Sequence, residues 1–466
     1  MNAALRRFLA LVAGPGLGLG AALWAAPALG LPAAATLGVT VWCAAWWVLE
    51  PVPIVVASLL PFVLLPAFGV ADQKAVGGAW GHPLILLLMG GFMLSTALEA
   101  SGAHRRLALG LVRLVGGRGP RGLVLGFMVA TAACSMWISN AATALMMMPV
   151  ATAALQADAA RRGGPSPIAA PLLLGVAYAA SIGGIGTPVG TPPNVIFMGV
   201  LKEMTGETMG FAQWMKLGVP VVLLFIPLAW AWLVRRVGPG APIAMEALPP
   251  WTSRERRVVA VFALVAAAWI FQDAPGGGWR AALGADGAGE STVALAGVLA
   301  LLALPAGDGA PLLRWGDAAR IPWDLLLLFA GGIAIARAFE TTGLATAVGG
   351  GLVEGLGLAA WPPALRVAAI ALAVTFLTEV TSNTALTTLL MPVLAAAGVA
   401  AGLPPAELML PAAMSASCAF MLPVATAPNA IVCATGEVRT AVMAREGFGM
   451  NLIGVAVITG VVVLLG

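Results

Sequence analysis

Residues 378 to 392 read TEVTSNTALTTLLMP, and residues 135 to 149, which lie 243 positions earlier, read SMWISNAATALMMMP. When the two stretches are aligned, the Ser-Asn pair at 139–140 falls on the Ser-Asn pair at 382–383. Each pair lies inside an otherwise apolar run. An unpaired amide is costly in hydrocarbon, so polar residues within membrane segments usually serve a site. Two pairs at matched positions therefore predict one shared polar site rather than contact with lipid.

The composition places the chain among membrane proteins. Of 466 residues, 60% are hydrophobic and 9% are charged, and the mean hydropathy is +0.97. The sequence pI near 9.2 comes from arginines in short clusters between apolar runs, which is typical of topology signals and does not indicate a nucleic-acid partner. The four cysteines lack metal-ligand spacing. No cofactor is expected.

Apolar stretches recur through the whole chain, and at about 20 residues per span they predict an all-α polytopic membrane protein with about 11 transmembrane helices and two re-entrant helical hairpins. Residues 1–32 form an extra N-terminal transmembrane helix in this interpretation. No separate soluble domain is visible.

Two further pairs of matched blocks indicate an internal repeat. Residues 88–102, LMGGFMLSTALEASG, match 328–343, and residues 188–196, PVGTPPNVI, match PVATAPNAI at 423–431. Three blocks in the same order predict two homologous halves. The halves are expected at 33–237 and 257–466, with a cytoplasmic linker at 238–256.

The distribution of arginine predicts that the repeats are inverted. One arginine, Arg366, lies near the second Ser-Asn pair, and seven lie near the first: Arg105, Arg106, Arg113, Arg118, Arg121, Arg161 and Arg162. By the positive-inside rule, the first pair is approached from the cytoplasm and the second from outside. Inverted repeats with a midplane site are common in secondary transporters. The N-terminus is expected in the cytoplasm and the C-terminus outside, in a bacterial inner membrane.

The expected hairpins cover residues 122–155, on the cytoplasmic side, and 365–397, on the outer side. The Pro- and Gly-rich blocks predict unwound helices at about 183–194 and 422–430, because Pro lacks an N–H and Gly relaxes the backbone. Freed carbonyls suit small hard cations, and helix N-termini suit anions. A neutral site with both features predicts an anion that is transported together with cations.

The sequence also resembles a known family. The segments SNA at 139–141, SNT at 382–384 and ASCAFMLPVATAPNAIV at 416–432 are similar to the divalent anion:sodium symporters, which import di- and tricarboxylates or sulfate. The resemblance covers about residue 36 to the C-terminus. It implies a transporter and no enzymatic activity, a homodimer that works by an elevator mechanism, and sodium as the coupling ion.

The resemblance also implies the site residues. The first sodium site would use Ser135, Ser139, Asn140 and carbonyls near Gly184 to Gly186. The second would use Thr378, Thr381, Asn383 and carbonyls near Ala425. A small dianion, such as succinate, malate or fumarate, would contact Ser139, Asn140, Thr191, Ser382, Asn383, Thr384 and Thr426.

Two positions break the symmetry between the halves. Ala141 stands where the family usually has Thr, so one hydroxyl is missing from the first motif. Glu379 lies four residues before Asn383, where it could orient the tip of the second hairpin, but Met136 takes that place in the first half, which argues against an essential symmetric role for the acid.

Alternative functions remain open at this stage. Within the transporter class they are a sulfate importer and a sodium-independent dicarboxylate exchanger. Outside it they are an anion channel and an intramembrane serine enzyme, although neither His82 nor His104 belongs to the matched polar motifs.

Overall fold

The computed structural model describes residues 3–117, 119–241, 250–273, 277–307, 309–357 and 360–466. Arg118 and the central part of the expected linker, residues 242–249, lie outside the described residues. Within the described ranges the regular secondary structure is helical, apart from an isolated bridge between Pro305 and Pro311. The all-α class is therefore confirmed.

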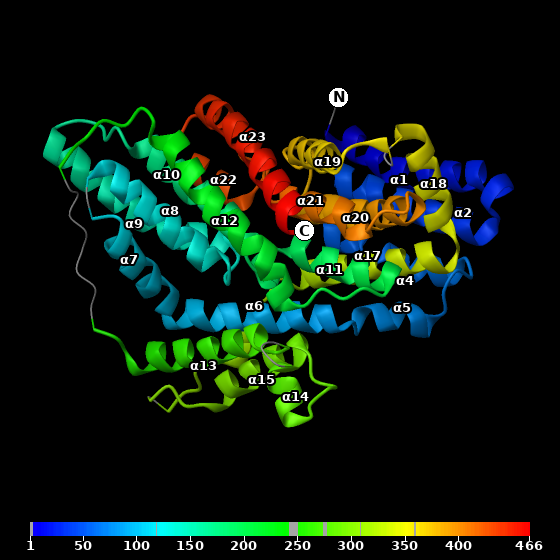
Figure 1. Cartoon of the computed structure of the whole chain (residues 1–466), viewed down its shortest axis with the longest axis horizontal. Helices are drawn as coiled ribbons and strands as arrows, with labels where there is room; N and C mark the ends of the chain where they lie inside the picture. Colours follow the sequence, from blue (N-terminus) through cyan, green and yellow to red (C-terminus); the bar gives the residue numbers. More distant parts are fainter. Residues whose placement is uncertain (1–2, 118, 242–249, 274–276, 308, 358–359) are drawn as a thin grey trace.

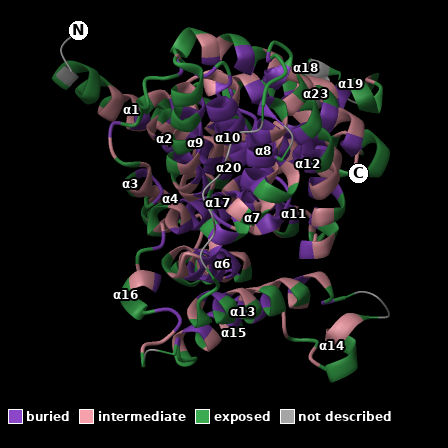
Figure 2. Cartoon of the chain, turned by 90° about the vertical axis from the view of Figure 1, so that its left-hand side faces the viewer, coloured by how far each residue is buried: buried purple, intermediate pink, exposed green. Residues whose placement is uncertain are grey.

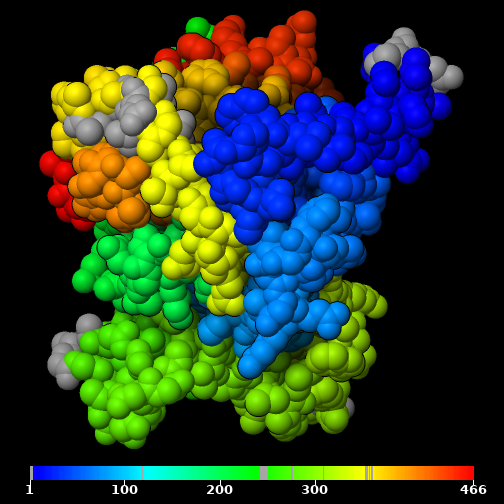
Figure 3. All heavy atoms as spheres, turned by 90° about the vertical axis from the view of Figure 1, so that its right-hand side faces the viewer, coloured from blue at the N-terminus to red at the C-terminus, as the bar shows by residue number. Residues whose placement is uncertain are grey.

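The N-terminal elements form one edge of the molecule. They are α1 (Ala3–Leu29), α2 (Leu31–Leu49), α3 (Ile54–Ala57), α4 (Leu60–Ala67) and α5 (Gln73–Trp80). Figure 3 shows α1 in dark blue at the periphery, where Leu23 and Trp24 are 67% and 81% exposed. Such exposure of large apolar side chains is expected on a helix that faces lipid. The helices α1 and α2 pack closely, because a Cβ on Gly18 would lie 2.6 Å from the Gly38 carbonyl oxygen.

The next elements contain the first Ser-Asn pair. They are α6 (Pro83–Ser101), α7 (Ala103–Val115), α8 (Pro120–Ser135), α9 (Asn140–Arg162), α10 (Ala169–Gly184), the short 3-10 helix η1 (Pro188–Gly190), α11 (Pro192–Thr205) and α12 (Phe211–Val234). The amphipathic α7 carries Arg105, Arg106 and Arg113.

The elements after the linker contain the second pair. They are α13 (Ser253–Ile270), α14 (Gly278–Leu283), α15 (Glu290–Ala303), α16 (Trp315–Ala318), α17 (Trp323–Thr341), α18 (Leu344–Leu356), α19 (Pro363–Leu377), α20 (Asn383–Ala400), α21 (Pro405–Ser415), α22 (Ala427–Ala434) and α23 (Thr440–Leu465).

Six helices of the described chain are long and apolar enough to cross a membrane, and a seventh span results if the bent pair at residues 323–351 is counted as one. Five shorter apolar helices include α8, α10 and α19, which end next to the breaks described below. The expected count of about 11 spans stays a prediction, since broken helices do not reach the ~30 Å length on their own.

Figure 1 shows α13, α14 and α15 as a layer beneath α6, separate from the main bundle. A buried ion pair fixes this layer to α7: Arg106 Nε donates to Glu255 Oε1 over 2.9 Å. Burial alone would raise the pKa of Glu255, but hydrogen bonds from Arg106 and from Thr252 lower it below its ordinary value. Glu255 therefore stays charged and keeps its partner.

Figure 2 shows the buried residues in the interior of the bundle, which includes much of α8, α10, α17 and α20. All thirteen residues of α10 from Leu172 to Gly184 are buried. The polar motifs of α8, α10 and α20 therefore lie in the interior of the bundle, where uncompensated polar groups are costly.

Candidate functional site

Both Ser-Asn pairs lie at breaks between helices. The chain turns between Ser135, the end of α8, and Asn140, the start of α9, and again between Leu377 and Asn383. Ser139 and Ser382 are the N-caps: each hydroxyl oxygen accepts from the backbone N–H three residues later, over 3.3 and 3.4 Å. Capping satisfies donors that the break leaves free. The serines thus stabilise the breaks that place the asparagines.

Three oxygens meet at the first break and form what we call the first oxygen cluster. The Ser135 hydroxyl lies 2.8 Å from Asn140 Oδ1 and 2.7 Å from the carbonyl oxygen of Ala180 on α10. A Cβ on Gly184 would lie 2.7 Å from the same Oδ1, so the end of α10 abuts the cluster. One hydroxyl proton cannot serve two acceptors at once. The cluster has more oxygen lone pairs than protons, which suits a small hard cation.

The second oxygen cluster repeats this arrangement. The Thr378 hydroxyl lies 2.6 Å from Asn383 Oδ1 and 2.9 Å from the carbonyl oxygen of Ala416, which follows α21. Thr378 is fully buried. The same atom types therefore meet in the same order at both breaks.

The unwound segments are braced in matching ways by one asparagine each. Asn194 Nδ2 donates to the carbonyls of Gly184 and Thr187, over 2.9 and 2.7 Å. Asn429 Nδ2 donates to the carbonyls of Ala419 and Leu422, both over 3.0 Å. Each asparagine thus ties the start of one helix to the residues ten and seven positions before it.

The amide oxygens of Asn194 and Asn429 are buried without a hydrogen-bond partner in the described chain, and so are the hydroxyls of Ser181 and Ser417. These serines directly follow the two clustered carbonyls, those of Ala180 and Ala416. Orphaned buried oxygens are costly unless a ligand or water satisfies them.

The two breaks belong to one bundle. The helix that follows the first break, α9, packs against α22, and the helix that follows the second break, α20, packs against α11. The helix that follows the first unwound segment, α11, therefore packs on the helix of the second Ser-Asn pair. The helix that follows the second unwound segment, α22, packs on the helix of the first pair. The second segment extends over residues 416–426, so it begins earlier than the expected range of about 422–430 and also ends earlier, because residues 427–430 belong to α22.

The other residues singled out from the sequence have different surroundings. Thr191 is buried at the start of α11. It lies next to Gly184, because a Cβ added to Gly184 would be 3.2 Å from the Thr191 Cβ. The Thr381 hydroxyl donates to the Leu377 carbonyl over 2.8 Å. The carbonyl oxygen of Gly186 lies against Gly218 of α12, since a Cβ there would be 3.1 Å away.

Three further residues of the expected site belong to the second half. Thr384 is 8% exposed, in the first turn of α20. Thr426 caps α22 and accepts from the Asn429 N–H over 3.3 Å. The Ala425 N–H donates to the Leu422 carbonyl over 3.2 Å.

Glu379 has hydrogen-bond partners that the sequence did not reveal. Its buried carboxylate accepts hydrogen bonds from the backbone N–H groups of Phe420, Met421 and Leu422, over 2.7 to 3.1 Å, and from Asn451 Nδ2 over 2.9 Å. Consecutive N–H groups that converge on one anion form a nest. The acid therefore holds the second unwound segment in place.

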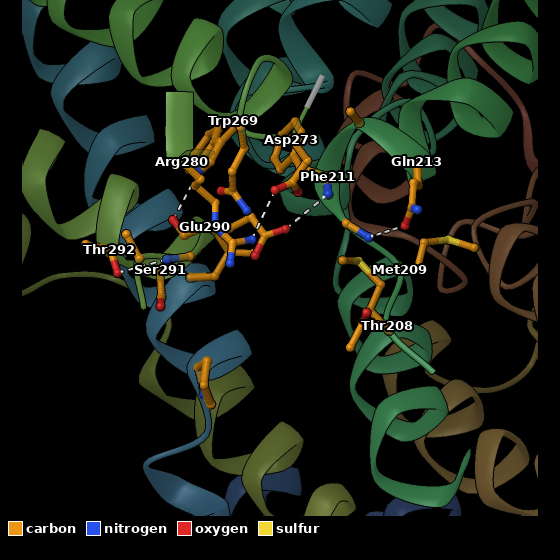
Figure 4. A pocket seen from close by; sticks show the side chains of 18 of the residues that line it. Thr208, Met209, Phe211, Gln213, Trp269, Asp273, Arg280, Glu290, Ser291 and Thr292 are labelled. Atoms are coloured by element: carbon orange, nitrogen blue, oxygen red, sulfur yellow. Dashed lines mark hydrogen bonds and ion pairs between the residues drawn. The ribbon is translucent and has the colours of Figure 1, made fainter. Parts of the chain in front are cut away.

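A cavity of about 680 Å³ lies elsewhere: between the start of α6, the end of α11, the start of α12 and the layer α13 to α15 (Figure 4). In it, Glu290 Oε1 accepts from the Phe211 N–H over 3.2 Å, and Arg280 pairs with Asp273 at 3.1 Å. Phe211 stacks between Trp269 and Trp137 of the first break. None of the residues lining this cavity belongs to the oxygen clusters.

No group of three or more His, Cys, Asp or Glu side chains that could hold a metal occurs among the described residues. The two clusters consist of neutral amide, hydroxyl and carbonyl oxygens instead. A helical membrane fold in which broken helices bring such oxygens together is typical of a secondary transporter.

Comparisons with known proteins agree with this class. The model of the citrate transporter family matches residues 44–403. The sodium-dependent dicarboxylate transporter SdcS of Staphylococcus saprophyticus is 36% identical over 451 residues, which is 92% of this chain and 85% of that protein. SdcS of Staphylococcus aureus strain RF122 is 35% identical over 447 residues, 91% of this chain and 84% of that protein. The chain therefore belongs to the divalent anion:sodium symporter family of membrane transporters.

Two solved structures share the fold. The YdaH transporter of Alcanivorax borkumensis superposes with a TM-score of 0.60, 15% identity and coverage of 84% of this chain and 88% of that chain. MtrF of Neisseria gonorrhoeae gives a TM-score of 0.61, 13% identity and coverage of 88% and 86%. At such identities the likeness concerns the fold alone.

Proposed function

We propose that the chain imports small dianions together with sodium ions, and that its substrates are C4-dicarboxylates such as succinate, malate and fumarate. The matched pair of oxygen clusters carries this proposal, because two clusters of neutral oxygens next to helix N-termini suit the binding of cations together with an anion. The relatives named sodium-dependent dicarboxylate transporters support it.

The first sodium ion would bind Ser135, Asn140 and the carbonyls of Ala180 and Gly184, with Ser139 at the cap. The second would bind Thr378, Asn383 and the carbonyl of Ala416, with Thr381 on the same turn. The carbonyls of Gly186 and Ala425 complete the set inferred from the family.

The dianion would lie between the two breaks, where four helices start: α9, α11, α20 and α22. Helix N-termini carry partial positive charge and free N–H groups, so they attract carboxylates without a basic side chain. The contacts would come from the residues at those starts: Ser139, Asn140, Thr191, Ser382, Asn383, Thr384 and Thr426.

Charge balance favours coupling to cations. A dianion that enters a cell with a negative interior is opposed by ~4.6 kcal/mol per 100 mV, at ~2.3 kcal/mol for each elementary charge. Two sodium ions cancel this cost, and a third would make uptake electrogenic.

We also propose two inverted repeats, 33–237 and 257–466, that move by an elevator mechanism within a homodimer in the inner membrane. The reciprocal packing of α9 on α22 and of α20 on α11 supports the repeat. The arginines at the ends of α7, α9 and α12 support a cytoplasmic N-terminus and an outer C-terminus.

Uptake of labelled succinate and sulfate into proteoliposomes, with and without an inward sodium gradient, tests the function. We expect uphill accumulation of succinate only with the gradient. Accumulation that does not depend on sodium would contradict coupling and indicate an exchanger, and preferential accumulation of sulfate would indicate a sulfate importer. Equilibration without accumulation would indicate a channel, and chemical conversion of the substrate would indicate an enzyme.

Replacing Gly184 with alanine should weaken sodium binding at the first cluster. The new Cβ would lie 2.7 Å from Asn140 Oδ1, too close for either group to keep its position. We expect an increase of about tenfold in the sodium concentration for half-maximal uptake, equivalent to ~1.4 kcal/mol. Gly460→Ala is the matched control, because its Cβ would meet nothing within 4 Å. Equal sodium dependence in both variants would show that Gly184 does not contribute to the first sodium site.

Replacing Ala141 with threonine should restore the missing hydroxyl beside the substrate. A hydrogen bond to a charged group contributes ~1.5–3 kcal/mol, so the succinate concentration for half-maximal uptake should fall by about tenfold. The converse change in the other motif, Thr384→Ala, should raise it by a similar factor. Competition among succinate, citrate and sulfate provides the measurement, and an unchanged affinity and ranking in Ala141→Thr would dismiss this role.

A further inference from the structure

A groove runs between α12 and α23, which lie side by side in Figure 1. Both helices are long and apolar enough to cross the membrane. The groove encloses about 480 Å³ and is lined by Leu228, Ala231, Trp232, Arg235, Ile453, Ala456 and Val457. The lining is apolar except at Arg235, so one end of the groove is charged.

Three arginines converge on one carboxylate at this end. Glu446 lies 2.6 Å from Arg235, 3.0 Å from Arg445 and 3.9 Å from Arg236, measured between side-chain nitrogen and oxygen atoms. The Glu446 side chain is 9% exposed, whereas those of Arg236 and Arg445 are 68% and 62% exposed. One carboxylate neutralises one guanidinium, which leaves a surplus of two positive charges at the mouth of the groove.

The charged end is held rigidly by Trp232. The indole N–H donates to the Glu446 carbonyl over 3.2 Å, and the Arg235 guanidinium lies 3.9 Å from the centre of the ring. Gly449 allows this placement, because a Cβ there would lie 2.3 Å from the indole. Tryptophan at such a position is typical of the level of lipid headgroups.

We propose that this groove is a binding site for an anionic phospholipid, with an acyl chain along the apolar lining and the phosphate between Arg236 and Arg445. Leu228, Ala231, Trp232 and Arg235 are spaced i, i+3, i+4 and i+7, so they share one helix face. Seven residues of helix span about 10 Å, enough for the upper part of an acyl chain below its phosphate. A zwitterionic lipid carries an ammonium group that the surplus positive charge disfavours.

The full chain in nanodiscs tests the site. Native mass spectrometry would count the phosphatidylglycerol and phosphatidylcholine molecules that remain bound after release from an equimolar mixture. We expect wild type to keep phosphatidylglycerol in preference to phosphatidylcholine. The double variant Arg236→Gln and Arg445→Gln should bind phosphatidylglycerol about tenfold more weakly than wild type. Equal retention of the two lipids by wild type would overturn the proposal.

Two further variants separate a site from a general charge effect. Arg256→Gln combined with Arg320→Gln removes the same charge from exposed residues elsewhere, Arg320 being 82% exposed, and should leave retention unchanged. Ala456→Trp fills the groove without changing charge, and should reduce retention as much as the arginine variant does. A loss in the control pair equal to that in the arginine pair would contradict the proposal, and so would normal retention in Ala456→Trp.

Inorganic phosphate provides the last arm of the test. Because the proposed ligand needs its acyl chain, phosphate alone in detergent should not raise the thermal unfolding midpoint of the protein, whereas phosphatidylglycerol should raise it. Equal stabilisation by phosphate would show a site for free anions and would overturn the lipid assignment. All of these measurements are independent of sodium coupling.

Discussion

Asn140→Ala and Asn383→Ala should each reduce sodium-driven succinate uptake by about 100-fold or more, because each removes the side-chain oxygen at the centre of one cluster. In the structure, Asn140 Oδ1 and Asn383 Oδ1 lie 2.8 and 2.6 Å from the hydroxyls of Ser135 and Thr378. Each asparagine is proposed to contact both a sodium ion and the substrate. Losing these contacts should cost ~3 kcal/mol, which corresponds to a reduction of about 100-fold. Uptake of labelled succinate into proteoliposomes provides the measurement.

The isosteric changes Asn140→Asp and Asn383→Asp serve as controls for each site. They keep an oxygen at the clustered position, so stabilisation of the protein by sodium, measured as the shift of its thermal unfolding midpoint, should survive in the aspartates and shrink in the alanines. The aspartate charge should still weaken uptake of the dianion. Near-normal transport in either alanine variant would remove that asparagine from the site.

The sequence predicted the parts of the site that depend on side-chain identity. Matched Ser-Asn pairs and Pro-Asn blocks predicted breaks at both places, and the structure brings together Ser135 with Asn140 and Thr378 with Asn383, which the family resemblance assigned to the same sodium sites. That these residues bind sodium stays a prediction. Broken helices with polar side chains leave a clear signal, because consecutive Pro and Gly residues cannot continue a helix and buried amides are rare inside membrane segments.

The backbone ligands could not be predicted in the same way. Every residue has a carbonyl, and the carbonyls of Ala180 and Ala416 join the clusters only because α10 packs against α8 and α21 against α19. The bracing role of Asn194 and Asn429 had a detectable signal, their matched place in the two blocks, but the target carbonyls depend on the path of the unwound chain.

The asymmetry at Glu379 shows a limit of arguing from repeats. Met136 at the matching position argued against an essential symmetric role for the acid, yet both residues connect the break to the neighbouring unwound segment. In the first half, the Thr187 hydroxyl donates to the Met136 carbonyl. In the second half, the Glu379 side chain accepts from three backbone N–H groups instead. Two chemistries thus perform one structural task, which a comparison of side chains cannot detect.

Glu379→Gln should therefore weaken the second sodium site while it leaves the first intact. One carboxylate oxygen of Glu379 accepts from the N–H groups of Phe420 and Met421, and the other accepts from those of Met421 and Leu422. Glutamine replaces one of these two oxygens with an NH₂ group, so a donor then faces two backbone donors. A buried donor without an acceptor costs ~1–3 kcal/mol. The strained segment begins at Ala416, whose carbonyl belongs to the second cluster.

We expect the sodium concentration for half-maximal uptake to rise by about tenfold or more in Glu379→Gln, and the steepness of the sodium dependence to fall, because one of two sites binds weakly. Asn451→Ala removes one donor and keeps the carboxylate, so its effect should have the same direction and be smaller. Met136→Leu is the matched control in the first half and should change neither quantity, since its bond to Thr187 uses the backbone. An unchanged sodium dependence in Glu379→Gln, with normal folding, would contradict the proposed role of the carboxylate in holding the second unwound segment. A side chain that only fills space at this position would tolerate the isosteric amide.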